Sequence, residues 1–238
     1  MKLPYEEFDL SGIKTYPLRS RQSKVSLAQF ATPYRKGSGV DGLLKSLPGL
    51  LAAQDFKDVV AAIVAGKAGG KARVWGLRAD VLETGLTPVL VDLMERGFVS
   101  AIATNGAGII HDFEIALSGG TSEDVDATLG PGTFGMAEET GTHLNRAIND
   151  GVKEGLGLGQ SVGKYLDAMK APFGQISVSA AAWRLQIPVT VHVAVGTDII
   201  HMHPQASGAA IGEGSLRDFK YFASSVARLE RGVYLNCG

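Results

Sequence analysis

Phe98-Val99-Ser100-Ala101-Ile102-Ala103 is a short apolar run that leads straight into the small residues Thr104-Asn105-Gly106-Ala107-Gly108. Residues 109–117 then carry apolar side chains at helical spacing, so the segment predicts a strand, a tight turn and a helix. Gly106 and Gly108 let a ligand approach the backbone, and the free N–H groups at the start of a helix suit a pyrophosphate. A plain turn between strand and helix, without a ligand, is the alternative.

The same alternation of strand and helix continues on both sides of this segment. Further strands are expected over residues 72–77, 188–195 and 233–235, and further helices from Thr87, with Pro88 at the first position, over 178–186 and over 216–231. Strands separated by helices favour a parallel sheet covered on both faces. The sequence therefore predicts an α/β fold with a Rossmann-like, doubly wound, mostly parallel sheet, whose ligands bind beyond the carboxyl ends of the strands.

Two other regions complete the predicted organisation. Residues 1–42 form an irregular N-terminal arm with a basic stretch at 19–24, and residues 43–238 form the α/β domain, beginning with helices over 43–67. A long glycine-rich polar loop is expected over 118–163, interrupted by a short helix capped by Thr121. Residues 155–164 match neither a phosphate loop nor a dinucleotide fingerprint, and we expect a flexible connector there.

Composition excludes several classes of protein. Of the 238 residues, 45% are hydrophobic and 20% are charged, which excludes a disordered chain. The formal net charge of -1 favours neither nucleic acid nor a membrane as a partner. Cys237 is the single cysteine, so no intrachain disulfide forms and a cytoplasmic location is expected. We expect neither a secretory leader nor a membrane-spanning segment.

Polar side chains follow two of the predicted strands. His111, Asp112 and Glu114 lie in the first turns of the helix after Gly108. Asp198, His201 and His203 lie in the loop after the 188–195 strand, where such a sheet places its ligand. Asp198 suits a ribose hydroxyl or a substrate ammonium group, and capping of the segment at Ile199 is the alternative.

The five histidines raise a metal hypothesis. His201 and His203 alternate on an extended segment and could converge on zinc together with His111, His143 or His192. No carboxylate or cysteine completes a recognisable ligand spacing, so no metal is predicted, and a metal-dependent hydrolase is kept as a third hypothesis.

Several short motifs together resemble the deoxyhypusine synthase family, especially its bacterial and archaeal members, over about two thirds of the chain. These motifs are Gly85-Leu86, Ala103 to Gly108 leading to Asp112, Asn145-Arg146, Ile187-Pro188-Val189, the Asp198 loop, and Gly232 to Gly238. The resemblance implies a Rossmann-like domain that binds NAD and a homotetramer with sites between subunits.

The resemblance also implies site residues. NAD would contact Asp80, Asn105, Gly106, Ala107, Gly108 and Gly238, and the polyamine spermidine would contact Asp198, His201 and His203. The family's active lysine belongs to a segment that has no counterpart before Gly238, so a C-terminally truncated protein is expected.

The predicted function is therefore that of a transferase in which NAD oxidises spermidine. Its aminobutyl group would pass to a lysine of a translation-factor precursor, forming the hypusine precursor, or to another polyamine. His111 would carry a proton, because an imidazole titrates near neutral pH. A nucleotide- or polyamine-binding protein without turnover is the alternative from a different class.

Overall fold

The computed structural model describes residues 6–238, and residues 1–5, where the irregular arm is predicted to begin, lie outside this range. The chain divides into two compact units, the first running to Val59 and the second from Val60 to Gly238. The first unit contains two short 3-10 turns, η1 (Leu18–Ser20) and η2 (Leu27–Gln29), and helix α1 (Gly39–Ser46). Helix α2 (Leu51–Ala68) spans the division, so helices occupy most of the predicted 43–67 region.

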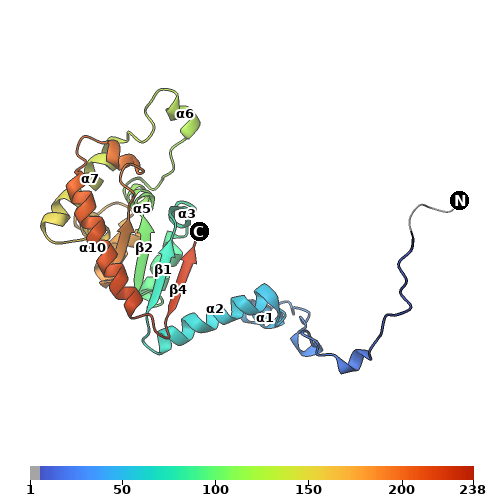
Figure 1. Cartoon of the computed structure of the whole chain (residues 1–238). Coiled ribbons are helices and arrows are strands. Elements are labelled where there is room, and N and C mark those ends of the chain that lie inside the picture. The colour runs from blue at the N-terminus through green and yellow to red at the C-terminus, as the bar shows by residue number, and fades with distance from the viewer. Residues whose placement is uncertain (1–5) are drawn as a thin grey trace. The chain divides into compact units, whose positions relative to one another are not determined.

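The second unit is built on one four-stranded sheet in which every strand is parallel, with the order β3-β2-β1-β4 (Figure 1). The strands are β1 (Arg73–Leu77), β2 (Ala101–Asn105), β3 (Val189–His192) and β4 (Val233–Cys237). The predicted α/β fold with a Rossmann-like parallel sheet is confirmed.

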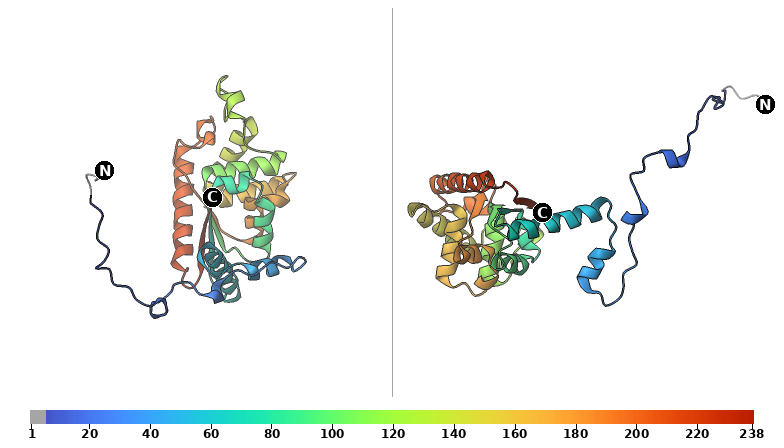
Figure 2. Two further views of the ribbon diagram at one scale, coloured as in Figure 1. Left: turned by 90° about the vertical axis from the view of Figure 1, so that its right-hand side faces the viewer. Right: turned by 90° about the horizontal axis from the view of Figure 1, so that it is seen from below.

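Helices cover both faces of this sheet. The helices of the second unit are α3 (Ala79–Glu83), α4 (Thr87–Glu95), α5 (Gly106–Ser118), α6 (Val125–Leu129), α7 (Glu138–Lys153), α8 (Leu158–Met169), α9 (Val178–Leu185) and α10 (Gly208–Ala227), with 3-10 turns η3 (Gly174–Ile176) and η4 (Ile199–Met202). Helix α6 lies in a loop that projects away from the sheet (Figure 1). Figure 2 shows α10 along one face and most other helices on the opposite face. Phe113, Ile102, Leu144 and Leu158 are among the fully buried side chains between the layers.

The direction of winding reverses once. The chain builds β1, β2 and β3 outward in one direction, and α10 then carries it back to place β4 on the other side of β1. In parallel sheets of this kind, ligands bind where the strand order reverses, beyond the carboxyl ends of the strands. Here that place lies beyond β1 and β4, next to Arg78 and Gly238.

Asp218 of α10 closes the free edge of the sheet at β3. Its carboxylate accepts hydrogen bonds from Val191 N at 2.9 Å and from Gly159 N at 3.1 Å. Burial raises the pKa of Asp218 to about 7, against the lowering effect of these backbone donors. This fully buried side chain therefore joins α10, the start of α8 and β3.

The predicted loop over 118–163 is correct as far as Ala137, where α6 alone interrupts the irregular segment, but it is wrong beyond Ala137, as is the flexible connector over 155–164. Helix α7 and the first half of α8 occupy most of residues 138–163. Its glycines allow close packing between elements, because a Cβ at Gly159 would overlap the Val189 carbonyl and one at Gly163 would overlap the Ser179 carbonyl. A glycine-rich composition that suggested a mobile loop therefore serves tight packing between helices.

Smaller differences concern the ends of elements. Thr87 lies inside the first turn of α4, and Leu86 occupies the cap position. The short helix α6 is capped by Asp124, whose side chain accepts from Ala127 N, and not by Thr121. Within residues 6–238, no helix is both long and apolar enough to cross a bilayer.

Candidate active site

The turns after β2 and β3 meet, because these two strands are neighbours. A Cβ at Gly106 would overlap the carboxylate of Asp198, so the absence of a side chain at Gly106 admits that carboxylate against the first turn of α5. Ala107 and Asp198 both border a cavity of about 920 Å³. The two loops that the sequence singled out therefore contribute to one site.

The charge of this cavity is one-sided. Five carboxylates and one imidazole line it, and no lysine or arginine of the described chain borders it. The acidic residues come from five separate parts of the fold and are Glu83, Glu114, Glu123, Glu139 and Asp198. A cavity with this charge attracts cations and repels phosphate groups.

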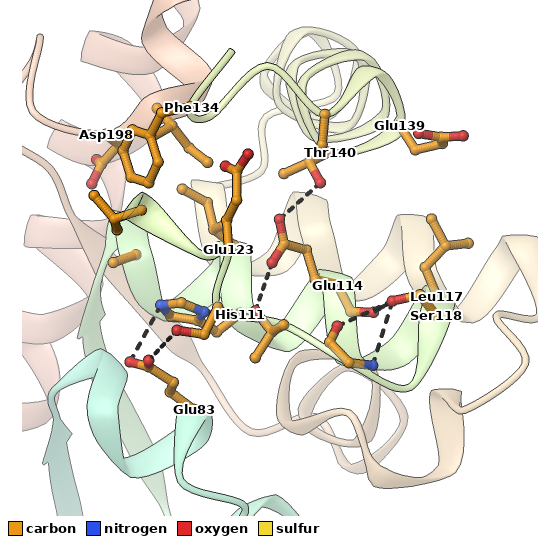
Figure 3. Close-up of a pocket in the computed structure, with 18 of the residues that line it drawn as sticks. Glu83, His111, Glu114, Leu117, Ser118, Glu123, Phe134, Glu139, Thr140 and Asp198 are labelled. Atoms are coloured by element: carbon orange, nitrogen blue, oxygen red, sulfur yellow. Dashed lines mark hydrogen bonds and ion pairs between the residues drawn. The ribbon is translucent and has the colours of Figure 1, made fainter. Parts of the chain in front are cut away.

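A chain of hydrogen bonds crosses the floor of the cavity (Figure 3). The Thr121 hydroxyl donates to Glu114 Oε2 at 2.6 Å, and the Thr140 hydroxyl donates to Glu114 Oε1 at 2.9 Å. Thr121 Oγ1 also lies 2.7 Å from His111 Nδ1. Since its one hydrogen is given to Glu114, Thr121 accepts from His111, which places the proton of a neutral imidazole on Nδ1.

The other nitrogen of His111 faces Glu83. His111 Nε2 lies 3.7 Å from Glu83 Oε2, across the gap between α5 and α3 (Figure 3). With Nδ1 committed to Thr121, Nε2 is the nitrogen that carries the lone pair of the neutral ring. The Glu83 carboxylate is the anionic group that faces this nitrogen. His111 is therefore arranged to accept a proton at Nε2.

Asp198 and His201 form a second pair beside the first turn of α5. His201 Nδ1 accepts from Gly196 N at 3.0 Å and from Asp198 N at 3.3 Å, so the proton of the neutral ring is on Nε2. That nitrogen lies 3.8 Å from Asp198 Oδ2, too far for a hydrogen bond. Burial raises the pKa of Asp198, while the charge of His201 acts to lower it. Asp198 borders the cavity, whereas His201 does not belong to its lining.

His203 and Asp112 stabilise the fold and do not line the cavity. His203 Nε2 lies 2.9 Å from the carbonyl of Gly135, and its ring packs against Gly141 of α7, away from the cavity lining. Asp112 is fully buried and accepts hydrogen bonds from Ser177 Oγ, Val178 N and Ser179 N at 2.8 to 2.9 Å. It therefore holds the start of α9 and does not face a ligand.

The predicted cofactor residues are divided between two places. Ala107 borders the acidic cavity, whereas Asn105 borders a separate hollow of about 370 Å³, lined also by Arg78, His192 and Asn236. Asn105 also caps α5, because its Oδ1 accepts from Gly108 N at 3.0 Å.

The other three predicted contacts lie close to these places. A Cβ at Gly108 would overlap the Thr104 hydroxyl, so that glycine serves packing within the turn. Asp80 lies 3.4 Å from the exposed Arg78 guanidinium, measured from Oδ1 to Nε. Gly238 has a φ of +123° and packs against the Arg78 side chain. Arg78, paired with Asp80, therefore lies at the carboxyl edge beside Gly238.

Sequence reasoning missed most of the acidic lining. Glu83, Glu123 and Glu139 had no local signal, since each lies in a polar stretch that a solvent-exposed surface explains equally well. Thr121 had a helix-capping signal, but its hydroxyl serves His111 and Glu114 instead. Among residues 6–238, no three His, Cys, Asp or Glu side chains are grouped to hold a metal ion, so the metal-dependent hydrolase hypothesis has no ligand set.

No protein-family model and no curated protein sequence matches the chain. Several solved structures resemble it distantly. The apo structure of ArgZ, an arginine dihydrolase from the ornithine-ammonia cycle in cyanobacteria, is 16% identical over 74% of this chain and 22% of its own, with a TM-score of 0.49. A putative LOR/SDH protein from Methanococcus maripaludis S2 is 15% identical over 84% and 53%, with a TM-score of 0.43.

A mutant of AgrE in complex with L-arginine is 15% identical over 81% of this chain and 26% of its own, with a TM-score of 0.46. The chain thus spans between about a fifth and about half of the length of these structures. At these values the similarity is a distant likeness of the backbone.

The predicted membership in the deoxyhypusine synthase family is wrong, because the structures that resemble the chain are ArgZ, the LOR/SDH protein and AgrE. The predicted transfer of an aminobutyl group from spermidine is wrong with it, and the polyamine-binding alternative has no support. The physical reason lies in the motifs. Asn105 caps α5, Asp112 accepts hydrogen bonds at the start of α9, and Asn145 donates to the carbonyls of Gly141 and Ile200. These residues therefore have structural roles that many parallel α/β folds need, and the motifs do not distinguish one family.

Proposed function

We propose that this chain forms the cofactor-binding part of an enzyme that uses NAD to oxidise a small organic cation at a carbon that carries an amine. The observation that carries the proposal is the acidic cavity, in which His111 offers a proton-accepting nitrogen. The Rossmann-like sheet allows a nucleotide cofactor at its carboxyl edge.

The carboxylates supply recognition. A protonated amine that leaves water needs an anionic partner, and charge-assisted hydrogen bonds to carboxylates are about twice as strong as neutral ones. Glu114 lies at the centre of the lining, with both oxygens already oriented by Thr121 and Thr140. Its lone pairs not used by these hydroxyls remain for a cationic group of the substrate.

His111 supplies the acid-base function. An ammonium nitrogen must lose a proton before its carbon gives up a hydride, and Nε2 of His111 is the acceptor on this wall. The Glu83 carboxylate stabilises the resulting imidazolium, at 3.7 Å between Oε2 and Nε2. The substrate leaves as an iminium ion, having lost one proton to His111 and one hydride.

The residues near Arg78 fit a nucleotide. The Arg78 guanidinium is 71% exposed, lies where the strand order reverses, and suits a diphosphate, while Asn105 and Asn236 in the same hollow suit ribose hydroxyls. When bound, NAD accepts the hydride. The sequence predicts the diphosphate at the first turn of α5. That turn does not suit an anion, because the Asp198 carboxylate packs against Gly106.

Binding of each component tests the proposal separately. NADH fluorescence measures cofactor binding, and calorimetry with L-lysine against its neutral analogue L-norleucine measures recognition of a side-chain cation. We expect L-lysine to bind and L-norleucine to bind at least about tenfold more weakly. Glu114→Gln should weaken L-lysine binding and leave NADH binding unchanged.

Glu95→Gln is the matched control, since Glu95 is exposed on α4 and lies outside the cavity lining. Equal binding of L-lysine and L-norleucine would show that the acidic lining does not select cations. Formation of NADH with a panel of basic amino acids and primary amines tests turnover, and binding of the amines without NADH formation would contradict the oxidation.

A further inference from the structure

A second charged hollow lies at the opposite edge of the sheet, at the amino ends of the strands. Its volume is about 790 Å³, and its lining includes Arg73 at the start of β1, Ala101 at the start of β2 and Pro188 before β3. In Figure 1 this is the lower end of the sheet, where α10 ends. The hollow is therefore separate from the acidic cavity, which lies beyond the carboxyl ends.

Its charge is the reverse of that of the acidic cavity. Among the described residues, Glu230 is the one carboxylate in the lining, and four cationic side chains accompany it: Lys71, Arg73, Arg228 and Arg231. Among residues 6–238, none of the four lies within 4.0 Å of a carboxylate. In a chain whose formal net charge is -1, this unneutralised cluster is a local feature and not a consequence of composition.

Capping of helix ends explains part of the cluster. Arg73 Nη1 donates to the carbonyl of Gly66 at 3.3 Å in α2, and Arg228 Nε donates to the carbonyl of Ser224 at 3.2 Å in α10. Cations near the last carbonyls of a helix are ordinarily stabilising. The side chains of Lys71 and Arg231 donate no hydrogen bond within the described part of the chain, so capping leaves these two cations unexplained.

Arg73 also presents an unused donor. Its Nε is buried and has no hydrogen-bond partner within the described residues. A buried donor without an acceptor costs free energy, and an anion in the hollow would supply that acceptor once the Arg73 side chain turns to expose its Nε. Lys71, Arg228 and Arg231 are exposed, so their charged ends are free to turn toward the same anion.

We propose that this hollow binds a small molecule carrying two or more phosphate groups. Guanidinium groups bind phosphate oxygens in pairs, and three arginines with one lysine match a polyphosphate better than a single carboxylate. No aromatic side chain of residues 6–238 lines the hollow, whereas single-stranded nucleic acids are bound by stacking bases on aromatic rings. The lining therefore favours a compact phosphorylated ligand over RNA.

Calorimetry with inorganic tripolyphosphate at low salt tests the proposal. The wild-type chain should bind it in a saturable manner, and the double variant Arg228→Gln with Arg231→Asn should bind at least about tenfold more weakly. Asparagine is chosen at position 231 because Arg231 has a φ of +58°, which asparagine tolerates. Lys220→Gln is the control, since Lys220 is exposed on α10, which precedes Arg228, and lies outside the hollow.

Lys71→Gln is a second, independent variant, for the case in which the double variant melts at a lower temperature. The Nε–H signal of Arg73 in a nitrogen-15 NMR spectrum gives a further readout and should shift on addition of tripolyphosphate. Wild-type affinity in both variants, or an unmoved Arg73 signal at saturation, would overturn the proposal. Tighter binding of a single-stranded RNA, lost in the same variants, would assign the surface to nucleic acid instead.

Discussion

His111 Nε2 lies 3.7 Å from Glu83 Oε2, while its Nδ1 lies 2.7 Å from the Thr121 hydroxyl. The ring is thus oriented by the Thr121 hydroxyl on one side and faces the Glu83 carboxylate on the other. Glu83 belongs to α3, His111 to α5 and Thr121 to the segment after α5. Three parts of the chain therefore define the state of one imidazole, which is the arrangement expected of a group that exchanges protons.

Replacement of His111 tests its proposed role. His111→Gln should lower the rate of NADH formation with an amine substrate by about 10²–10⁴-fold, the usual contribution of a general base. Amine binding should change by less than about threefold, because the carboxylates that attract the cation remain. Steady-state kinetics together with calorimetry separates the two effects. A variant that keeps its rate but loses amine affinity would assign His111 to binding alone.

Replacement of Asp112 tests its structural role. Asp112→Ala should reduce the free energy of unfolding by about 3–5 kcal/mol, since Ser177 Oγ, Val178 N and Ser179 N lose their acceptor in a buried place. Asp112→Asn should cost less, because the amide oxygen still accepts a hydrogen bond. Chemical denaturation measures both, with the exposed Asp126→Ala as control. Equal stability of Asp112→Ala and the wild type would mean that α9 begins without this carboxylate.

We expect the stability of the fold to depend on pH through Asp218. Burial raises the pKa of its carboxyl to about 7 in the folded chain, from 3.8 as the ordinary value. The folded state therefore binds the proton more tightly than the unfolded state, and stability falls as the pH rises from 3.8 through 7. Between about pH 5 and pH 8 the titration of Asp218 alone should lower the free energy of unfolding by roughly 2–3 kcal/mol.

Denaturation curves at several pH values measure this slope. Asp218→Asn should flatten it, because the amide does not titrate and still accepts from Val191 N or Gly159 N. A wild-type chain whose stability rises over this interval would contradict the assignment. Asp218→Asn with the wild-type slope would show that another group titrates.

Gly163 tests the close packing of α8. A Cβ there would meet the Ser179 carbonyl and approach Trp183 Cβ at 3.2 Å, so Gly163→Ala should destabilise the fold by about 1–3 kcal/mol. Gly120→Ala is the control, because open space surrounds that position. Thermal unfolding compares the two variants. A neutral Gly163→Ala would mean that α8 shifts away from α9 without cost.

The sequence by itself determined the fold class. Apolar runs such as residues 98–103 and 188–195 alternate with helical patterns, and that alternation leads to a parallel sheet because each strand needs a covering helix. It also placed Asp198 and Gly106 at the ends of strands, which the order of β2 and β3 then brought into contact. The spacing of hydrophobic residues indicates which face of a single helix or strand is buried, and this information is local to that element.

Only the tertiary structure decided how separate elements face one another. It turned Asp112 toward α9 and His111, its neighbour, toward Glu83, although both have the same polar signal in the sequence. It also packed the glycines of α8 against β3 and α9, where composition suggested a loop. The physical reason is that adjacent residues on a helix point about 100° apart, and the packing of that helix determines which one is buried.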